Sequence, residues 1–152
     1  MSTSIVLTRE HIYPAVAVVS TFWISFWQAI RVGSARKASG IHYPQLYAEK
    51  ADVAASVEAN KFNCTQRAHQ NTLEYIPTVA ISTVITSVKH PLVAASLCGA
   101  WALFRVPYTI GYSTGDPARR NLLGSAVVGT VMWLGLLAAS TWTLVELLRE
   151  TL

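Results

Sequence analysis

The chain has 152 residues and a formal net charge of +4, and 52% of its residues are hydrophobic whereas only 13% are charged. Because soluble domains carry charge on roughly a quarter of their residues, this composition leaves too little polar surface for a water-soluble shell. It excludes an ordinary soluble domain, and the modest positive charge does not call for a nucleic-acid partner.

Long apolar stretches predict four transmembrane helices, since each reaches or approaches the ~20 residues needed to cross a bilayer. These helices are expected at residues 14–34, 65–89, 91–113 and 121–149. A buried core helix is the alternative for the second stretch, because its purely apolar part, 76–88, is short. We expect an all-α integral membrane protein, a four-helix bundle forming one membrane domain over residues 1–152.

Local signals along the chain set the expected ends of these helices. The first helix should end near Gly33, and the long polar connection after it should form a loop with short helical pieces. Asn63 or Thr65 is the candidate cap of the second helix, which Pro77 should kink. The third helix should stop at the "GYSTGDP" segment.

Basic residues are concentrated in or beside the first and third loops, and the positive-inside rule places both loops in the cytosol. These residues are Arg31, Arg36, Lys37, Lys50, Lys61, Arg67, Arg119 and Arg120. The opposite side offers Arg9, Lys89 and Arg149. The two cysteines, Cys64 and Cys98, form no metal or redox spacing, so no metal site is expected.

The second helix opens with polar residues that share one face. Arg67, Asn71 and Glu74 are spaced four and three apart, whereas His69 points elsewhere. Ionisable groups within a membrane span cost about 2.5 to 3.5 kcal/mol at its centre and usually face a bundle interior or a wet cavity. The alternative is a structural ion pair between Arg67 and Glu74 at the interface.

The third helix carries a second polar stripe near the same end. Arg105, Tyr108 and Tyr112 are spaced three and four apart, so they also share one face. Two facing polar stripes beside a basic cluster predict a site for a small, soluble, anionic ligand. Glu74 is available for a cationic group on that ligand.

Three segments resemble the membrane-associated proteins in eicosanoid and glutathione metabolism, the MAPEG family. They are "GSARKASGIHYPQLYA", "FNCTQRAHQNTLEYIP" and "LFRVPYTIGYSTGDPARRNLLGS". The resemblance covers nearly the whole chain. It implies a left-handed four-helix bundle that forms a homotrimer in the endoplasmic reticulum membrane, with glutathione held between neighbouring subunits on the cytosolic side. The two carboxylates, ammonium and thiol of glutathione match a basic cluster with one glutamate.

The resemblance also implies which residues contact glutathione. By motif position they are Arg36, Arg67, Asn71, Glu74, Tyr75, Tyr108 and Tyr112. His69 stands where leukotriene-forming relatives often have glutamine. Arg105 is also expected to bind glutathione, because it lies on the second polar stripe.

In the family, an arginine after the third helix activates the thiol. A fixed cation favours the thiolate, which is the nucleophile. The "PARRN" segment offers two candidates, Arg119 and Arg120. Alignment with the family by the residue after the arginine favours Arg120, whereas the spacing from Tyr112 can favour Arg119. We assign the role to Arg120. The expected reaction is conjugation of glutathione to a lipophilic electrophile or reduction of a lipid hydroperoxide, between which the sequence does not choose. The alternative is a non-catalytic, lipid-binding scaffold of the lipoxygenase-activating type.

Overall fold

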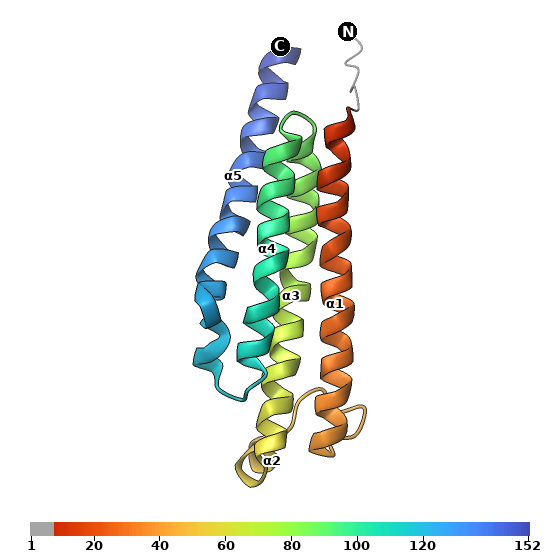
Figure 1. The fold of residues 1–152 in the computed structure, drawn as a ribbon, viewed down its shortest axis with the longest axis vertical. Coiled ribbons are helices and arrows are strands. Elements are labelled where there is room, and N and C mark those ends of the chain that lie inside the picture. The colour runs from red at the N-terminus through yellow and green to blue at the C-terminus, as the bar shows by residue number, and fades with distance from the viewer. Residues whose placement is uncertain (1–7) are drawn as a thin grey trace.

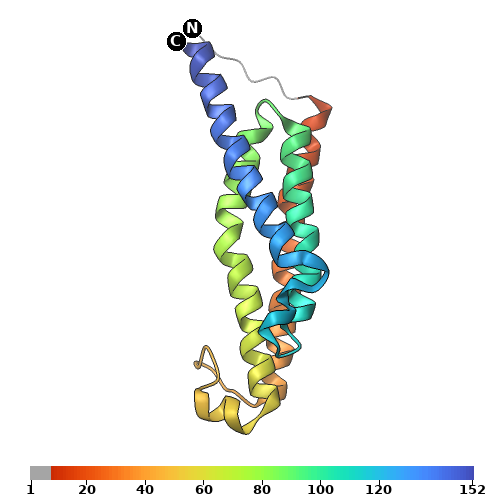
Figure 2. The same ribbon diagram turned by 90° about the vertical axis from the view of Figure 1, so that its left-hand side faces the viewer.

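The computed structural model describes residues 8–152, in which four long helices lie side by side (Figures 1 and 2). They are α1 (Ile12–Ser39), α3 (Val57–Ser87), α4 (Pro91–Tyr112) and α5 (Ser125–Thr151). The short elements are η1 (Arg9–His11), α2 (Lys50–Ala55) and η2 (Pro117–Gly124). We call the end of the bundle with α2 and η2 the loop end, and the end with the α3–α4 turn the turn end.

Within residues 8–152, three helical stretches are long and apolar enough to cross a membrane. They are Arg9–Ser39, Pro91–Tyr112 and Pro117–Thr151. Large apolar side chains on their outer faces are exposed, such as Trp23 at 67% and Leu103 at 67%. An apolar exterior of this kind suits contact with lipid. Helix α3 is not among the three stretches, and its first half is rich in polar and charged residues.

A polar contact in the middle of the bundle joins three of the helices. The Gln28 side chain of α1 is fully buried, and its Nε2 donates to Thr72 Oγ1 of α3 at 2.9 Å and to Thr109 Oγ1 of α4 at 2.6 Å. Hydroxyl and amide groups of this kind hold helices together where the apolar surroundings offer no other partner. The contact fixes how α3 and α4 lie against α1.

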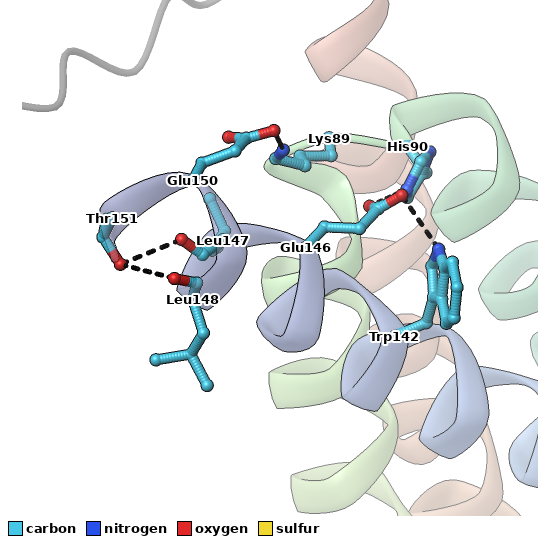
Figure 3. A network of polar contacts seen from close by, with 8 residues as sticks. All are labelled: Lys89, His90, Trp142, Glu146, Leu147, Leu148, Glu150 and Thr151. Atoms are coloured by element: carbon cyan, nitrogen blue, oxygen red, sulfur yellow. Dashed lines mark hydrogen bonds and ion pairs between the residues drawn. The ribbon is translucent and has the colours of Figure 1, made fainter.

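At the turn end, ion pairs fasten α5 to the α3–α4 turn (Figure 3). Lys89 pairs with Glu150, and His90 Nε2 lies 2.7 Å from Glu146 Oε2. The Trp142 Nε1 donates to the other Glu146 oxygen at 2.9 Å. Both basic residues of the turn therefore have a carboxylate partner on α5.

Helix α3 begins earlier than the polar pattern predicted. It starts at Val57, where the Ser56 Oγ accepts a hydrogen bond from the Ala59 N–H at 3.4 Å. The prediction of Asn63 or Thr65 as the cap is wrong. Asn63 lies inside the helix and bonds the Ala48 backbone instead, accepting at 2.7 Å and donating at 2.9 Å. Its side chain thereby ties the loop before α2 to α3.

The two flanking helices also differ from their expected bounds. Helix α1 continues past Gly33 to Ser39 and ends at Gly40, whose φ of 70° is the left-handed conformation that glycine adopts readily. Helix α5 starts at Ser125 rather than at residue 121, because residues 121–123 have non-helical backbone angles. Hydrogen bonds of Asn121 and Ser125 hold that segment in place.

Candidate functional site

A cavity of 250 Å³ lies between α3, α4 and the start of α5, toward the loop end. It joins residues from both predicted stripes with residues of η2 and α5. Its lining consists of Asn71, Tyr75, Arg105, Tyr108, Arg120, Ser125, Ala126 and Thr130. The two stripes meet at this cavity. Arg105 NH1 donates a hydrogen bond to Asn71 Oδ1 at 2.7 Å, although the two residues are 34 positions apart in the sequence.

Arg105 is a buried cation with no carboxylate partner among residues 8–152. Its side chain is 6% exposed. The guanidinium carbon lies 4.6 Å from the ring centroid of Trp101, 4.9 Å from that of Tyr108 and 5.0 Å from that of Tyr75. Aromatic faces attract cations, yet a buried charge is stabilised fully only by an opposite charge. The cavity beside Arg105 therefore favours an anion.

Arg120 reaches the cavity because η2 packs closely against α4. At Gly111 an added Cβ would lie 2.0 Å from the Arg119 carbonyl oxygen, so only glycine permits this approach. The Ser125 Oγ donates to the Arg120 carbonyl at 2.9 Å. The Asn121 Oδ1 accepts from the Ala126 and Val127 N–H groups, at 3.1 and 3.3 Å, and so caps α5. These contacts hold the turn that presents Arg120.

Arg119 does not line the cavity. Its Nε lies 3.6 Å from Asp116 Oδ2, and its side chain is 67% exposed. Of the two adjacent arginines that the sequence offered, the cavity thus contains Arg120.

Arg67 and Glu74 lie next to the cavity but outside its lining. Arg67 NH1 and Glu74 Oε1 are 2.7 Å apart, with the two side chains 41% and 46% exposed. The ion pair that was the alternative interpretation is therefore present in this chain. An exposed pair of this kind contributes little stability, typically about 0 to 1 kcal/mol, so its partners can be exchanged for charges of a ligand.

Tyr112 and Tyr47 border this pair. The Tyr112 ring packs edge-on against that of Tyr108, with centroids 5.8 Å apart. The Tyr47 hydroxyl, from the loop before α2, donates to Gln70 Oε1. Burial raises the pKa of Tyr47, and the nearby Arg67 opposes this increase. Helical spacing could not have found Tyr47, because it lies on a loop.

Arg36 and His69 face other parts of the chain. Arg36 NH1 donates to the Gln45 carbonyl at 2.7 Å, and its guanidinium lies between the rings of Tyr43 and Phe62, at 4.2 and 4.5 Å. His69 Nε2 lies 3.3 Å from Ser25 Oγ of α1. Within one chain, neither residue reaches the cavity.

The model of the MAPEG family matches residues 14–140, which include all four long helices except the ends of α1 and α5. The chain belongs to the MAPEG family. This family includes glutathione transferases and related enzymes as well as non-catalytic members. The three apolar helices agree with this membership, and together they indicate an intracellular membrane protein.

Proposed function

We propose that this MAPEG protein is a membrane-bound glutathione transferase and peroxidase, most similar within the family to microsomal glutathione S-transferase three. The observation that carries the proposal is the 250 Å³ cavity in which Arg105 and Arg120 meet without a carboxylate partner from residues 8–152. Two cations at one cavity suit a ligand that carries carboxylates and an ionisable thiol.

Different residues around the cavity bind glutathione and activate its thiol. Arg105, Asn71 and the ring of Tyr108 hold the ligand, and Arg120 faces its thiol. A cation near a thiol lowers the thiol pKa from about 8.5 and so increases the thiolate fraction at neutral pH. Tyr75, which also lines the cavity, completes its wall.

Arg67 and Glu74 exchange partners when glutathione binds. A glutathione carboxylate takes the place of Glu74 at Arg67, and the glutathione ammonium takes the place of Arg67 at Glu74. The exchange replaces the one ion pair between Arg67 and Glu74 with two charge-assisted contacts to glutathione, and contacts of this class are stronger than neutral hydrogen bonds. The half-exposed position of this pair supports the exchange, because neither side chain has to leave a buried contact.

The thiolate then attacks one of two lipophilic substrates. With an electrophile, the sulfur electron pair forms a C–S bond. Either the bond to a leaving group breaks and that group departs with its electron pair, or the C=C π bond of an unsaturated carbonyl breaks and the resulting carbanion takes up a proton from water. With a lipid hydroperoxide, the sulfur attacks the distal oxygen and the O–O bond breaks, giving a sulfenic acid and a lipid alkoxide that takes a proton from water to become the alcohol. A second glutathione reduces the sulfenic acid, with release of water and glutathione disulfide.

The assembly and the membrane arrangement are part of the proposal. A homotrimer is supported by the places of Arg36 and His69, which do not line the cavity of their own chain and are candidates for a site completed between subunits. The proposal also includes four spanning helices, with α3 the fourth, in the endoplasmic reticulum membrane and with the loop end in the cytosol. In sealed microsomes, an impermeant thiol reagent should label a cysteine placed at Ser39 and spare one at Thr151.

A non-catalytic, lipid-binding scaffold is the second candidate function. It is favoured by an apolar cavity of 470 Å³ on the outer face of α4 beside η2. This cavity is lined by Leu103, Phe104, Val106, Pro107, Ile110, Leu122 and Leu123.

Binding and chemistry separate the two candidates. Glutathione added to the purified protein should produce the ultraviolet difference absorbance of a thiolate, and a lipophilic electrophile or a lipid hydroperoxide should then be consumed. Lipid binding with neither thiolate formation nor turnover would support the scaffold instead.

A further inference from the structure

A second polar cavity lies at the loop end, between α1 and the first turns of α3. It has a volume of 330 Å³ and shares no residue with the cavity around Arg105. Its lining combines an apolar wall with three charged side chains. The residues are Trp27, Ile30, Arg31, Ser34, Ala35, Glu58, Lys61, Thr65 and Ser113.

Two polar atoms at this cavity lack partners. The Nε of Arg31 and the Oγ of Ser113 are buried, and neither has a hydrogen-bond partner in the described part of the chain. Buried polar atoms nearly always have a partner, which can be water or a ligand. The Nε of Arg31 can only donate and the Ser113 hydroxyl can also donate, so an acceptor group would suit both atoms.

The charges around the cavity are unequal. Lys61 Nζ is 2.9 Å from Glu58 Oε1, so these two side chains neutralise each other. Arg31 has no carboxylate within ion-pair distance in residues 8–152. One net positive charge therefore remains at Arg31. This charge matches a ligand with a single negative charge, such as a phosphodiester.

Arg31 lies where the apolar part of α1 gives way to polar and basic residues, the level at which lipid headgroups are expected. The Arg31 guanidinium lies 5.2 Å from the Trp27 ring centroid, one helical turn away. Tryptophan prefers the membrane interface, and arginine near a helix end extends toward the polar headgroups. From here toward the turn end, α1 exposes Ile30, Phe26 and Trp23, at 55%, 58% and 67%. Acyl chains can lie along this apolar surface.

We propose that this cavity binds the headgroup of an anionic phospholipid. Its phosphodiester accepts hydrogen bonds from Arg31 and Ser113, and its acyl chains lie along the exposed face of α1. Because Glu58 is already paired with Lys61, a zwitterionic headgroup finds no free carboxylate for its ammonium, and anionic lipid is preferred. The proposal needs the apolar helices but not the glutathione chemistry, so it can fail or succeed independently of the proposed function.

Native mass spectrometry of the purified full-length protein tests the site. The protein is incubated separately with phosphatidylglycerol and with phosphatidylcholine, and the fraction of subunits that retains one lipid is measured. We expect wild type to retain phosphatidylglycerol about fivefold better, the equivalent of about 1 kcal/mol for one cationic side chain at the surface. Equal retention of the two lipids would overturn the preference for anionic lipid.

Variants locate the effect. Arg31→Gln should remove the preference, and Lys37→Gln, which removes a cation on the same helix outside the cavity, should keep it. Ser113→Ala is a smaller change that should reduce retention about two- to tenfold. Circular dichroism and gel filtration identify any variant that fails to fold. If Arg31→Gln does not fold, the smaller substitution Ser113→Ala still tests the site. Unchanged retention in folded Arg31→Gln and Ser113→Ala would refute the site.

A soluble anion is the other source of the same chemistry. Glycerol 3-phosphate carries a phosphate without acyl chains, so it should not displace phosphatidylglycerol at equal concentration. Displacement at that concentration would show that the cavity binds a soluble phosphate compound and would overturn the assignment to lipid.

Discussion

The polar network at the turn end and the cavity toward the loop end differ in whether their positive charges have carboxylate partners. At the turn end, Lys89 and His90 both contact carboxylates of α5, and the network is complete within one chain (Figure 3). Toward the loop end, Arg105 and Arg120 face a cavity and no carboxylate of residues 8–152 pairs with them. Paired charges stabilise the contact between helices, whereas unpaired cations beside a cavity are available to a ligand. The contrast predicts that substitutions of residues around the cavity change chemistry, whereas substitutions in the Lys89 and His90 network change only stability.

The largest effect is expected where the backbone places Arg120. In Gly111→Ala the new methyl group would lie 2.0 Å from the Arg119 carbonyl oxygen, so η2 must move and carry Arg120 out of the cavity. We expect turnover to be lost and the protein to be destabilised by about 1 to 3 kcal/mol, as for other overpacked sites. Turnover assays and thermal unfolding measure the two effects.

Gly99→Ala is the matched control on the same helix. An added Cβ there meets nothing within 4 Å, so turnover should stay at the wild-type level and helix stability should rise by up to about 1 kcal/mol. Equal losses in both variants would show that α4 tolerates no added methyl group, and would remove the argument for η2 placement.

Arg120→Ala tests the chemistry directly. Removing the cation raises the thiol pKa toward about 8.5, so only about 3% of the thiol is ionised at pH 7. Turnover at pH 7 should fall about 10- to 30-fold and recover as the pH rises above 8.5, while glutathione affinity changes much less. The measurement is a pH profile of conjugation and of hydroperoxide reduction.

Arg119→Ala is the control for this profile, because Arg119 pairs with Asp116 outside the cavity. It should keep the wild-type pH dependence. A wild-type profile for Arg120→Ala with a shifted one for Arg119→Ala would transfer the role to Arg119.

The effect expected for the pair beside the cavity is on glutathione binding rather than on turnover. Arg67→Ala and Glu74→Gln should each weaken glutathione binding by about 1.5 to 3 kcal/mol, the range for hydrogen bonds to charged groups. The stability of the apoprotein should change by about 1 kcal/mol or less, because the pair is half-exposed. Calorimetry of glutathione binding compares these variants with Glu58→Gln, which breaks a similarly exposed pair on the same helix. Wild-type affinity in both site variants would leave Arg67 and Glu74 with a structural role alone.

The smallest effect is expected at the turn end. Lys89→Ala removes an ion pair with Glu150, whose side chain is 61% exposed. The Tm should fall by less than about 3 °C, and turnover should not change. Should turnover fall while the Tm is kept, the two ends are coupled and the separation of roles is wrong.

The local pattern of the sequence was sufficient to predict the all-helical class and both polar stripes. Arg67, Asn71 and Glu74 share a face of α3 because the residues of a helix repeat every 3.6 positions, and the same rule aligned Arg105 with Tyr108 on α4. This periodicity depends only on the backbone of one helix, so it is readable without knowledge of the neighbouring helices. The bond between Asn71 and Arg105 agrees with the prediction that the two stripes face each other.

Tertiary contacts decided what local spacing could not. Arg119 and Arg120 are adjacent and chemically alike, and only the close approach of η2 to Gly111, with Asn121 capping α5, turns Arg120 toward the cavity. Arg36 is directed away because Gln45 and two aromatic rings from other segments surround it. Helix α3 starts at Val57 because Ser56 can cap it there, while Asn63 is engaged by Ala48. Each of these outcomes depends on groups brought together by folding, and their partners cannot be inferred from spacing along one helix.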